Sequence, residues 1–161
     1  MSATLRVAVH SETAFVQVSG RASFQNSEDL KSFCTKALDN PEVKTVSINM
    51  AACEGMDSTF MGILTMISLT ARQKSTPVEM VNTTAYCLEL LVQLGLKPMF
   101  DFVEREEELE TMTVLDESKE VSQEQHSTNV LTAHQTLIDV HEENRSEFQD
   151  IVNFLKDEQS K

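Results

Sequence analysis

The chain has 161 residues, of which 40% are hydrophobic, and a formal net charge of −13. That length and composition support one hydrophobic core, so we expect one domain with an extension. The acidic balance excludes nucleic acid as a partner, because a phosphate-binding surface is basic, and an anionic membrane would repel the chain as well. No apolar run approaches the roughly 20 residues of a membrane helix, and the first residues lack a signal-peptide pattern. We therefore expect a cytoplasmic protein.

Alternating apolar residues predict two strands at the start of the chain. The alternation covers residues 5–9 and 15–18, on either side of a turn-like Ser11-Glu12, and is typical of a hairpin. Ser27 can then cap a helix, which Asn40-Pro41 stops because proline restricts the residue before it.

The middle of the chain alternates strand-like and helix-like runs. Strands are predicted at 43–50, 78–81 and 99–103, and helices from Ser58 and from 82–84 to Gly95. Helices that alternate with strands after an opening hairpin predict an α/β sandwich with a mixed β-sheet.

The junction between the strand at 43–50 and the next helix is the candidate functional stretch. Asp57 or Ser58 occupies the N-cap, where a short side-chain oxygen accepts a hydrogen bond from the unpaired amides of the first turn. Asp-Ser-Thr tripeptides are common, so these residues alone indicate no more than a helix cap.

The order of elements around Asp57-Ser58-Thr59-Phe60-Met61-Gly62 resembles the STAS family, the sulfate transporter and anti-sigma-factor antagonist domains. The resemblance covers roughly residues 4–115 and implies a mixed sheet with helices mainly on one face. In the bacterial antagonists of the family, the serine directly after the aspartate is phosphorylated by a partner serine kinase. Ser58 stands at that position, and Thr59 is the alternate acceptor.

The resemblance also implies a function, that of an anti-sigma-factor antagonist acting as a phosphorylation-controlled switch. The unmodified protein would sequester a serine kinase that is also an anti-sigma factor, and a phosphatase would reset the switch. A phosphoryl group at a helix N-terminus is tolerated by the fold, so we expect the Ser58 hydroxyl to face solvent. The partner-binding residues implied are Asp57, Ser58, Thr59, Gly62, Arg21 and Ser23.

Three other functions remain open. The domain could be a scaffold subunit of a larger signalling assembly without a direct sigma-factor role, or a transporter regulator acting in trans. An enzyme with Ser58 as nucleophile needs a base, yet the four histidines lie on other elements and no Gly-x-Ser-x-Gly occurs. We therefore expect no catalytic residues and no cofactor.

The cysteines give no indication of a disulfide framework or a metal site. Cys34, Cys53 and Cys87 are odd in number and show no close pairing, so buried thiols are expected.

The charge divides the chain near residue 104. Residues 1–103 carry a net charge of −2, and residues 104–161 carry −11. We predict a STAS-like domain over 1–115, closed by a helix at 104–115, then a linker over 116–125 and an acidic C-terminal helix over 126–161. That last helix carries residues spaced alternately four and three apart, as in a coiled-coil seam, among them His134 and His141. It is expected either to fold back on the domain or to pair with a partner or a second copy.

Overall fold

The computed structural model describes residues 3–107, 111–115 and 120–160. The strands are β1 (Thr4–His10), β2 (Thr13–Ala22), β3 (Thr45–Met56), β4 (Val78–Val81), β5 (Asp101–Val103) and β6 (Thr113–Val114). The helices are α1 (Phe24–Asp39), α2 (Ser58–Gln73), α3 (Ala85–Gln93), α4 (Gln123–Val140) and α5 (Arg145–Gln159), with short 3₁₀ turns η1 (Lys97–Met99) and η2 (Glu142–Asn144).

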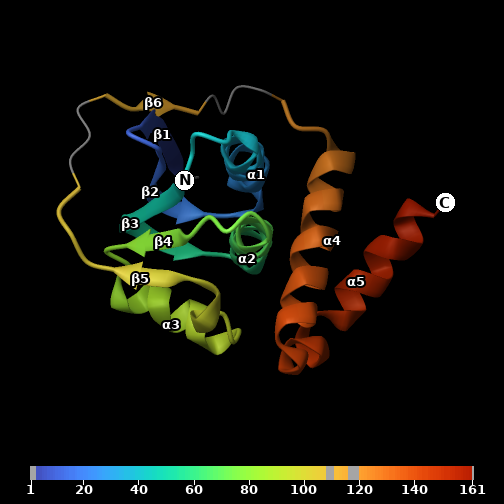
Figure 1. The fold of residues 1–161 in the computed structure, drawn as a ribbon. Coiled ribbons are helices and arrows are strands. Elements are labelled where there is room, and N and C mark those ends of the chain that lie inside the picture. The colour runs from blue at the N-terminus through green and yellow to red at the C-terminus, as the bar shows by residue number, and fades with distance from the viewer. Residues whose placement is uncertain (1–2, 108–110, 116–119, 161) are drawn as a thin grey trace.

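The strands form one mixed sheet in the order β5-β4-β3-β2-β1-β6 (Figure 1). β1 and β2 form the predicted antiparallel hairpin, and their two-residue turn places Ser11 and Glu12 at positive φ, as the tight hairpin turn requires. β2, β3, β4 and β5 pair in parallel, because each is reached through a helical or irregular crossover. The α/β fold with a mixed sheet is therefore confirmed.

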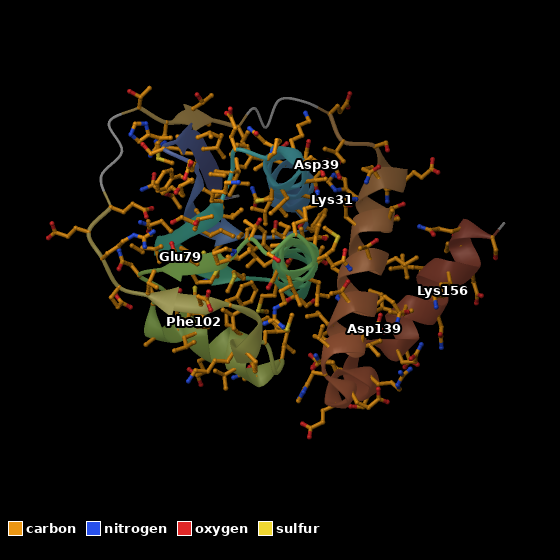
Figure 2. All side chains as sticks on the ribbon, viewed as in Figure 1. Lys31, Asp39, Glu79, Phe102, Asp139 and Lys156 are labelled. Atoms are coloured by element: carbon orange, nitrogen blue, oxygen red, sulfur yellow. The ribbon has the colours of Figure 1, made fainter. Side chains whose placement is uncertain are left out.

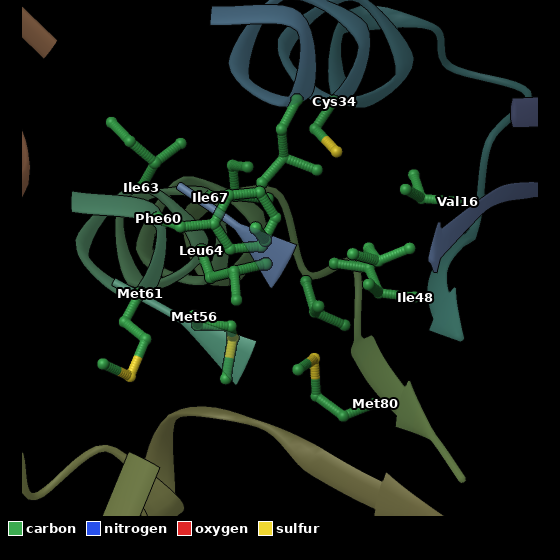
Figure 3. Packing of buried hydrophobic residues seen from close by; sticks show 14 of the residues in the cluster. Val16, Cys34, Ile48, Met56, Phe60, Met61, Ile63, Leu64, Ile67 and Met80 are labelled. Carbon is green, nitrogen blue, oxygen red and sulfur yellow. The ribbon is translucent and has the colours of Figure 1, made fainter. Parts of the chain in front are cut away.

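The core lies between the sheet and the helices α1 and α2. Phe60, Ile63 and Leu64 of α2 are fully buried, and Phe60 and Leu64 extend toward the side on which Ile48 and Met80 of the strands lie (Figure 3). The helical spacing in α2 and the alternation in β3 place these apolar residues on facing surfaces, as the sequence predicted.

Two local predictions were wrong. α1 begins at Phe24, because Ser23 caps it in a capping box with Asn26, whereas Ser27 lies inside the helix. The helix expected over 104–115 is not formed at the described residues, since β6 instead pairs with β1 and forms one edge of the sheet. In the acidic stretch that precedes β6, Glu107 accepts a hydrogen bond from the hydroxyl of Ser47 in the sheet at 3.1 Å. Residues 108–110 of that stretch lie outside the described ranges.

The C-terminal extension contains two helices where one was expected. α4 begins at Gln123, after the N-cap Ser122, and ends at Val140, because the extended backbone of His141 interrupts the helix before α5. α4 packs against α2 and α1, and α5 packs on α4 (Figure 1). Of the two arrangements left open by the sequence, the chain therefore adopts the one in which the extension folds back on its own domain.

The layers are thus the sheet, then α1 and α2, then α4 and α5. In Figure 2, Lys31 lies where α1 faces α4, while Asp139 and Lys156 belong to α4 and α5. Over the described ranges, the chain has no helix with the length and apolar character needed to cross a membrane.

Candidate functional site

Asp57 joins the start of α2 to the start of α1. Its Oδ1 accepts from the amide of Phe60 at 2.8 Å and caps α2, and its Oδ2 accepts from the amide of Phe24 at 2.9 Å. The Asp57 amide donates to the carbonyl of Ala22 at 3.0 Å. One carboxylate therefore satisfies free amides at two helix N-termini, and this fixes the turn that presents Ser58.

The segment from Arg21 to Ser23 lies beside this turn. The ends of β2 and β3 pair in parallel, with Arg21 opposite Gly55 and Ala22 opposite Met56. Ser23 caps α1 through a hydrogen bond from the amide of Gln25 to its hydroxyl at 3.2 Å. The fold therefore brings the residues grouped by the family resemblance into one neighbourhood.

The Ser58 hydroxyl contacts a histidine of the C-terminal extension. Ser58 is the first residue of α2 and is half-buried, and its Oγ lies 2.8 Å from Nε2 of His134. Nδ1 of the same ring lies 2.7 Å from the carbonyl of Val130. Since a carbonyl only accepts, we assign the ring proton to Nδ1, which leaves Nε2 of the neutral ring to accept from the Ser58 hydroxyl.

This contact changes one expectation. The sequence placed the Ser58 hydroxyl toward solvent, whereas α4 lies against it and His134 is only 4% exposed. The neighbouring Thr59 is more deeply buried, with 5% of its surface exposed. Ser58 is therefore the more accessible of the two candidate acceptors.

Gly62 marks the closest approach of α2 and α4. A Cβ at this position would lie 2.5 Å from the carbonyl oxygen and 2.6 Å from the Cβ of Ala133. Any larger residue would push the two helices apart, so a packing contact with α4 accounts for glycine here. The sequence assigned Gly62 to a partner surface, and the structure shows that α4 occupies that surface.

The pairing of Ser58 with His134 also bears on catalysis. The argument against an enzyme relied on the histidines lying on other elements, but the fold brings one of them within hydrogen-bonding distance of the serine, as a nucleophile and its base would be. Two surface cavities, of about 470 and 300 Å³, are lined by residues 9–12 with 40–44 and by residues 28–32 with 120–125. Neither of these cavities is lined by Ser58 or His134. The Ser58–His134 pair is a contact between α2 and α4.

The thiols are buried and free, as predicted. Burial raises the pKa of Cys34 to about 12. Within the part of the chain that the structure describes, no cluster of histidine, cysteine and carboxylate side chains could hold a metal ion.

Sequence reasoning missed the part that α4 plays at this site. The sequence predicted a coiled-coil seam that includes His134 and Leu137, and both residues are buried. Their spacing showed that one face of the helix is covered, but spacing within one helix does not reveal which distant surface covers it. Two small residues, Gly62 on α2 and Ala133 on α4, were the only signal of a close helix crossing.

The model of the STAS domain matches residues 4–109, which is more than half of the chain, and the chain belongs to this family. The family of STAS domains and anti-sigma antagonists is generally non-enzymatic. No curated protein sequence matches the chain.

Solved structures show the same fold at low sequence identity. The unphosphorylated anti-sigma factor antagonist SpoIIAA is 16% identical with a TM-score of 0.54, over 63% of this chain and 89% of that one. The phosphorylated Bacillus SpoIIAA is 17% identical with a TM-score of 0.54, over 64% and 92%. A candidate anti-sigma factor antagonist from Thermotoga maritima is 11% identical with a TM-score of 0.55, over 62% and 85%. α4 and α5 lie beyond the residues that the STAS domain model matches.

Proposed function

We propose that this chain is an anti-sigma-factor antagonist that works by partner switching in the cytoplasm. Its unmodified form sequesters a serine kinase that is also an anti-sigma factor, phosphorylation of Ser58 ends that binding, and a phosphatase restores it. The observation that carries the proposal is the place of Ser58, directly after the capping Asp57 at the first turn of α2 in a STAS domain. The phosphorylated and unphosphorylated forms of SpoIIAA share this fold.

The geometry supports a switch that acts on binding and leaves the fold intact. A phosphoryl group adds about 1.5 to 2 negative charges and three acceptor oxygens. At the start of a helix these oxygens face free amides and the positive end of the helix dipole, so the domain tolerates them. Beside Asp57 the added charge repels an acidic docking face and raises the cost of desolvating an apolar one.

Phosphopeptide mapping tests this proposal. The chain is isolated from its native cells after growth under different stresses, as wild type and as Ser58→Ala, with Thr59→Ala as the matched control. We expect kinase-dependent phosphate on wild type and Thr59→Ala and none on Ser58→Ala, and we expect Ser58→Asp to bind the kinase more weakly. Phosphate that persists when both hydroxyls are replaced would remove the switch from consideration.

The second candidate is a scaffold subunit of a larger signalling assembly. It is favoured by α5, on which Phe154 is 62% and Ile151 is 39% exposed, because exposed apolar residues on one helix are typical of a docking element. A scaffold self-associates without a kinase, so light scattering of wild type and Ser58→Ala separates the two functions. Assembly that is identical in both proteins, and lost in Phe154→Ser, supports the scaffold.

A further inference from the structure

α4 occupies the surface that a partner must reach. It lies over α1 and α2 on the side opposite the sheet, so both helices are between the sheet and α4 (Figure 1). Its His134 accepts the hydrogen bond of the Ser58 hydroxyl, and its Ala133 lies against Gly62. The candidate acceptor and the glycine beside it are therefore both engaged by the chain's own extension.

The contact of α4 with α1 is specific and polar. Asn129 is fully buried; its amide donates to Oε2 of Glu28 at 2.7 Å, and its Oδ1 accepts from Nζ of Lys31 at 3.2 Å. Nε2 of Gln125 also donates to Oδ1 of Asn129 at 3.2 Å, so four side chains from two helices form one hydrogen-bonded group. Such a group selects one position and orientation of a helix on this face.

The contact also has the character of an interface between separable parts. The buried residues of α4 comprise the apolar Ala133, Leu137 and Ile138 and the polar Asn129 and His134. A mixture of this kind is typical of contacts between domains, which are more polar than a core. Nδ1 of His126 is buried at this contact without a hydrogen-bond partner in the described chain, which lowers the stability of docking.

We propose that the face formed by α1 and α2 is a binding site for a single helix, which α4 fills in the closed chain and a helix of the partner protein fills in its place. The partner helix presents a small residue to Gly62 and, on the adjacent position, a hydrogen-bond acceptor to Ser58. That the incoming helix belongs to a regulatory partner rests on the proposed function, whereas the exchange of α4 does not.

The docking of α4, which we call the closed form, also controls access to Ser58. A kinase must take the Ser58 hydroxyl into its own active site, but that hydroxyl donates to His134 and is half-covered by α4. The chain is therefore phosphorylated only in its open form, at a rate set by the open fraction.

A peptide that supplies α4 in trans tests the exchange. The probe is a fluorescent peptide of residues 122–160 with the native sequence, which covers α4, η2 and α5. The receptor is the full-length chain with Ala133→Leu, in which the larger side chain cannot lie against Gly62. Hydrogen exchange then shows whether α4 is released while the amides of β3 stay protected. Leu137→Asp provides a second opened receptor, because it buries a carboxylate in the same contact.

We expect the native peptide to bind either opened receptor saturably. A matched peptide carrying Ala133→Leu should bind about 5- to 150-fold more weakly, as overpacking at one contact predicts. The wild-type chain should bind the native peptide weakly as well, because its tethered α4 competes at an effective concentration in the millimolar range.

Three results would overturn the proposal: equal binding of the two peptides, no binding to a receptor whose α4 is released, or loss of β3 protection together with α4 in both variants. The last would show that α4 unfolds only with the core. No kinase takes part in this experiment. If the peptide exchanges but native cells put no phosphate on Ser58, the helix-binding site is retained and the phosphorylation switch is discarded. If Ser58 is phosphorylated but the peptide does not exchange, the switch alone is retained.

Discussion

Replacing Gly62 with alanine tests the close helix crossing, because the expected sign depends on whether α4 is docked. On an isolated α2 the change is favourable by about 0.5–1 kcal/mol, since alanine loses less backbone entropy in a helix. In the closed chain the new Cβ would lie 2.5 Å from the Ala133 carbonyl oxygen, where ordinary contact begins at 3.4 Å. α4 must then retreat by roughly 1 Å, and overpacking of this kind costs about 1–3 kcal/mol.

The entropy gain acts on α2 whether or not α4 is docked, so the docking of α4 bears the whole cost of overpacking, about 1–3 kcal/mol, or about 5- to 150-fold in its docking constant. Hydrogen exchange followed by mass spectrometry should show amides of α4 exchanging faster by that factor, with β3 unchanged. Gly55→Ala is the matched control, because its Cβ would meet Arg21 and Tyr86 only at 3.6 Å. A Gly62→Ala chain that is more stable than wild type, with α4 equally protected, would refute the reasoning.

Three further predictions follow from single contacts. Ser58→Ala leaves Nε2 of the buried His134 without its donor, so we expect urea denaturation to show a loss of about 1–3 kcal/mol; an unchanged midpoint would mean that this hydrogen bond is not formed in solution. Asn129→Ala leaves Glu28 and Lys31 without this hydrogen-bond partner at the contact of α4 with α1 and should speed exchange in α4 by about tenfold, whereas the control Gln149→Ala, whose side chain bonds Arg145 and Asn153 within α5, should not. Burial raises the pKa of Cys34 from 9.0 to about 12. The folded chain thus keeps a proton that the unfolded chain releases, and the free energy of unfolding should fall by up to about 1.4 kcal/mol per pH unit above pH 9, with a smaller slope in Cys34→Ala.

The periodic elements of the fold could be predicted from the sequence. The apolar alternation in β3 and the helical spacing in α2 each follow from which face of the element is buried, so local pattern is sufficient. Asp57 was one of two predicted caps, and the structure selects it because its carboxylate also serves the amide of Phe24.

The errors arose where distant partners decide the local structure. Residues 113–114 pair with β1, and a two-residue edge strand gives no periodic signal of its own. A helix was predicted over 126–161, but its break at His141 was not. There the side chain of Asn144 donates to the carbonyl of Leu137 in α4 at 2.8 Å and to the carbonyl of Leu94 at 2.9 Å, and the second contact requires the docked domain.

The sequence pattern of α4 also could not predict which surface of the domain this helix covers. A histidine on a helix seam gives no sign that its partner is a serine 76 residues away. The same sequence pattern fits a helix that pairs with a second chain, and the close crossing of Gly62 and Ala133 is one of the contacts that identify the face that is used.

The most direct test is the amount of phosphate on residue 58 when the full-length chain is incubated with ATP and a lysate of its native cells. Quantitative mass spectrometry would compare wild type, the opened Ala133→Leu chain and Ser58→Ala. The account predicts phosphate on Ser58 in wild type, faster incorporation when α4 is released, and none on Ser58→Ala. Equal incorporation in wild type and the opened chain, or phosphate found only at other residues, would contradict it.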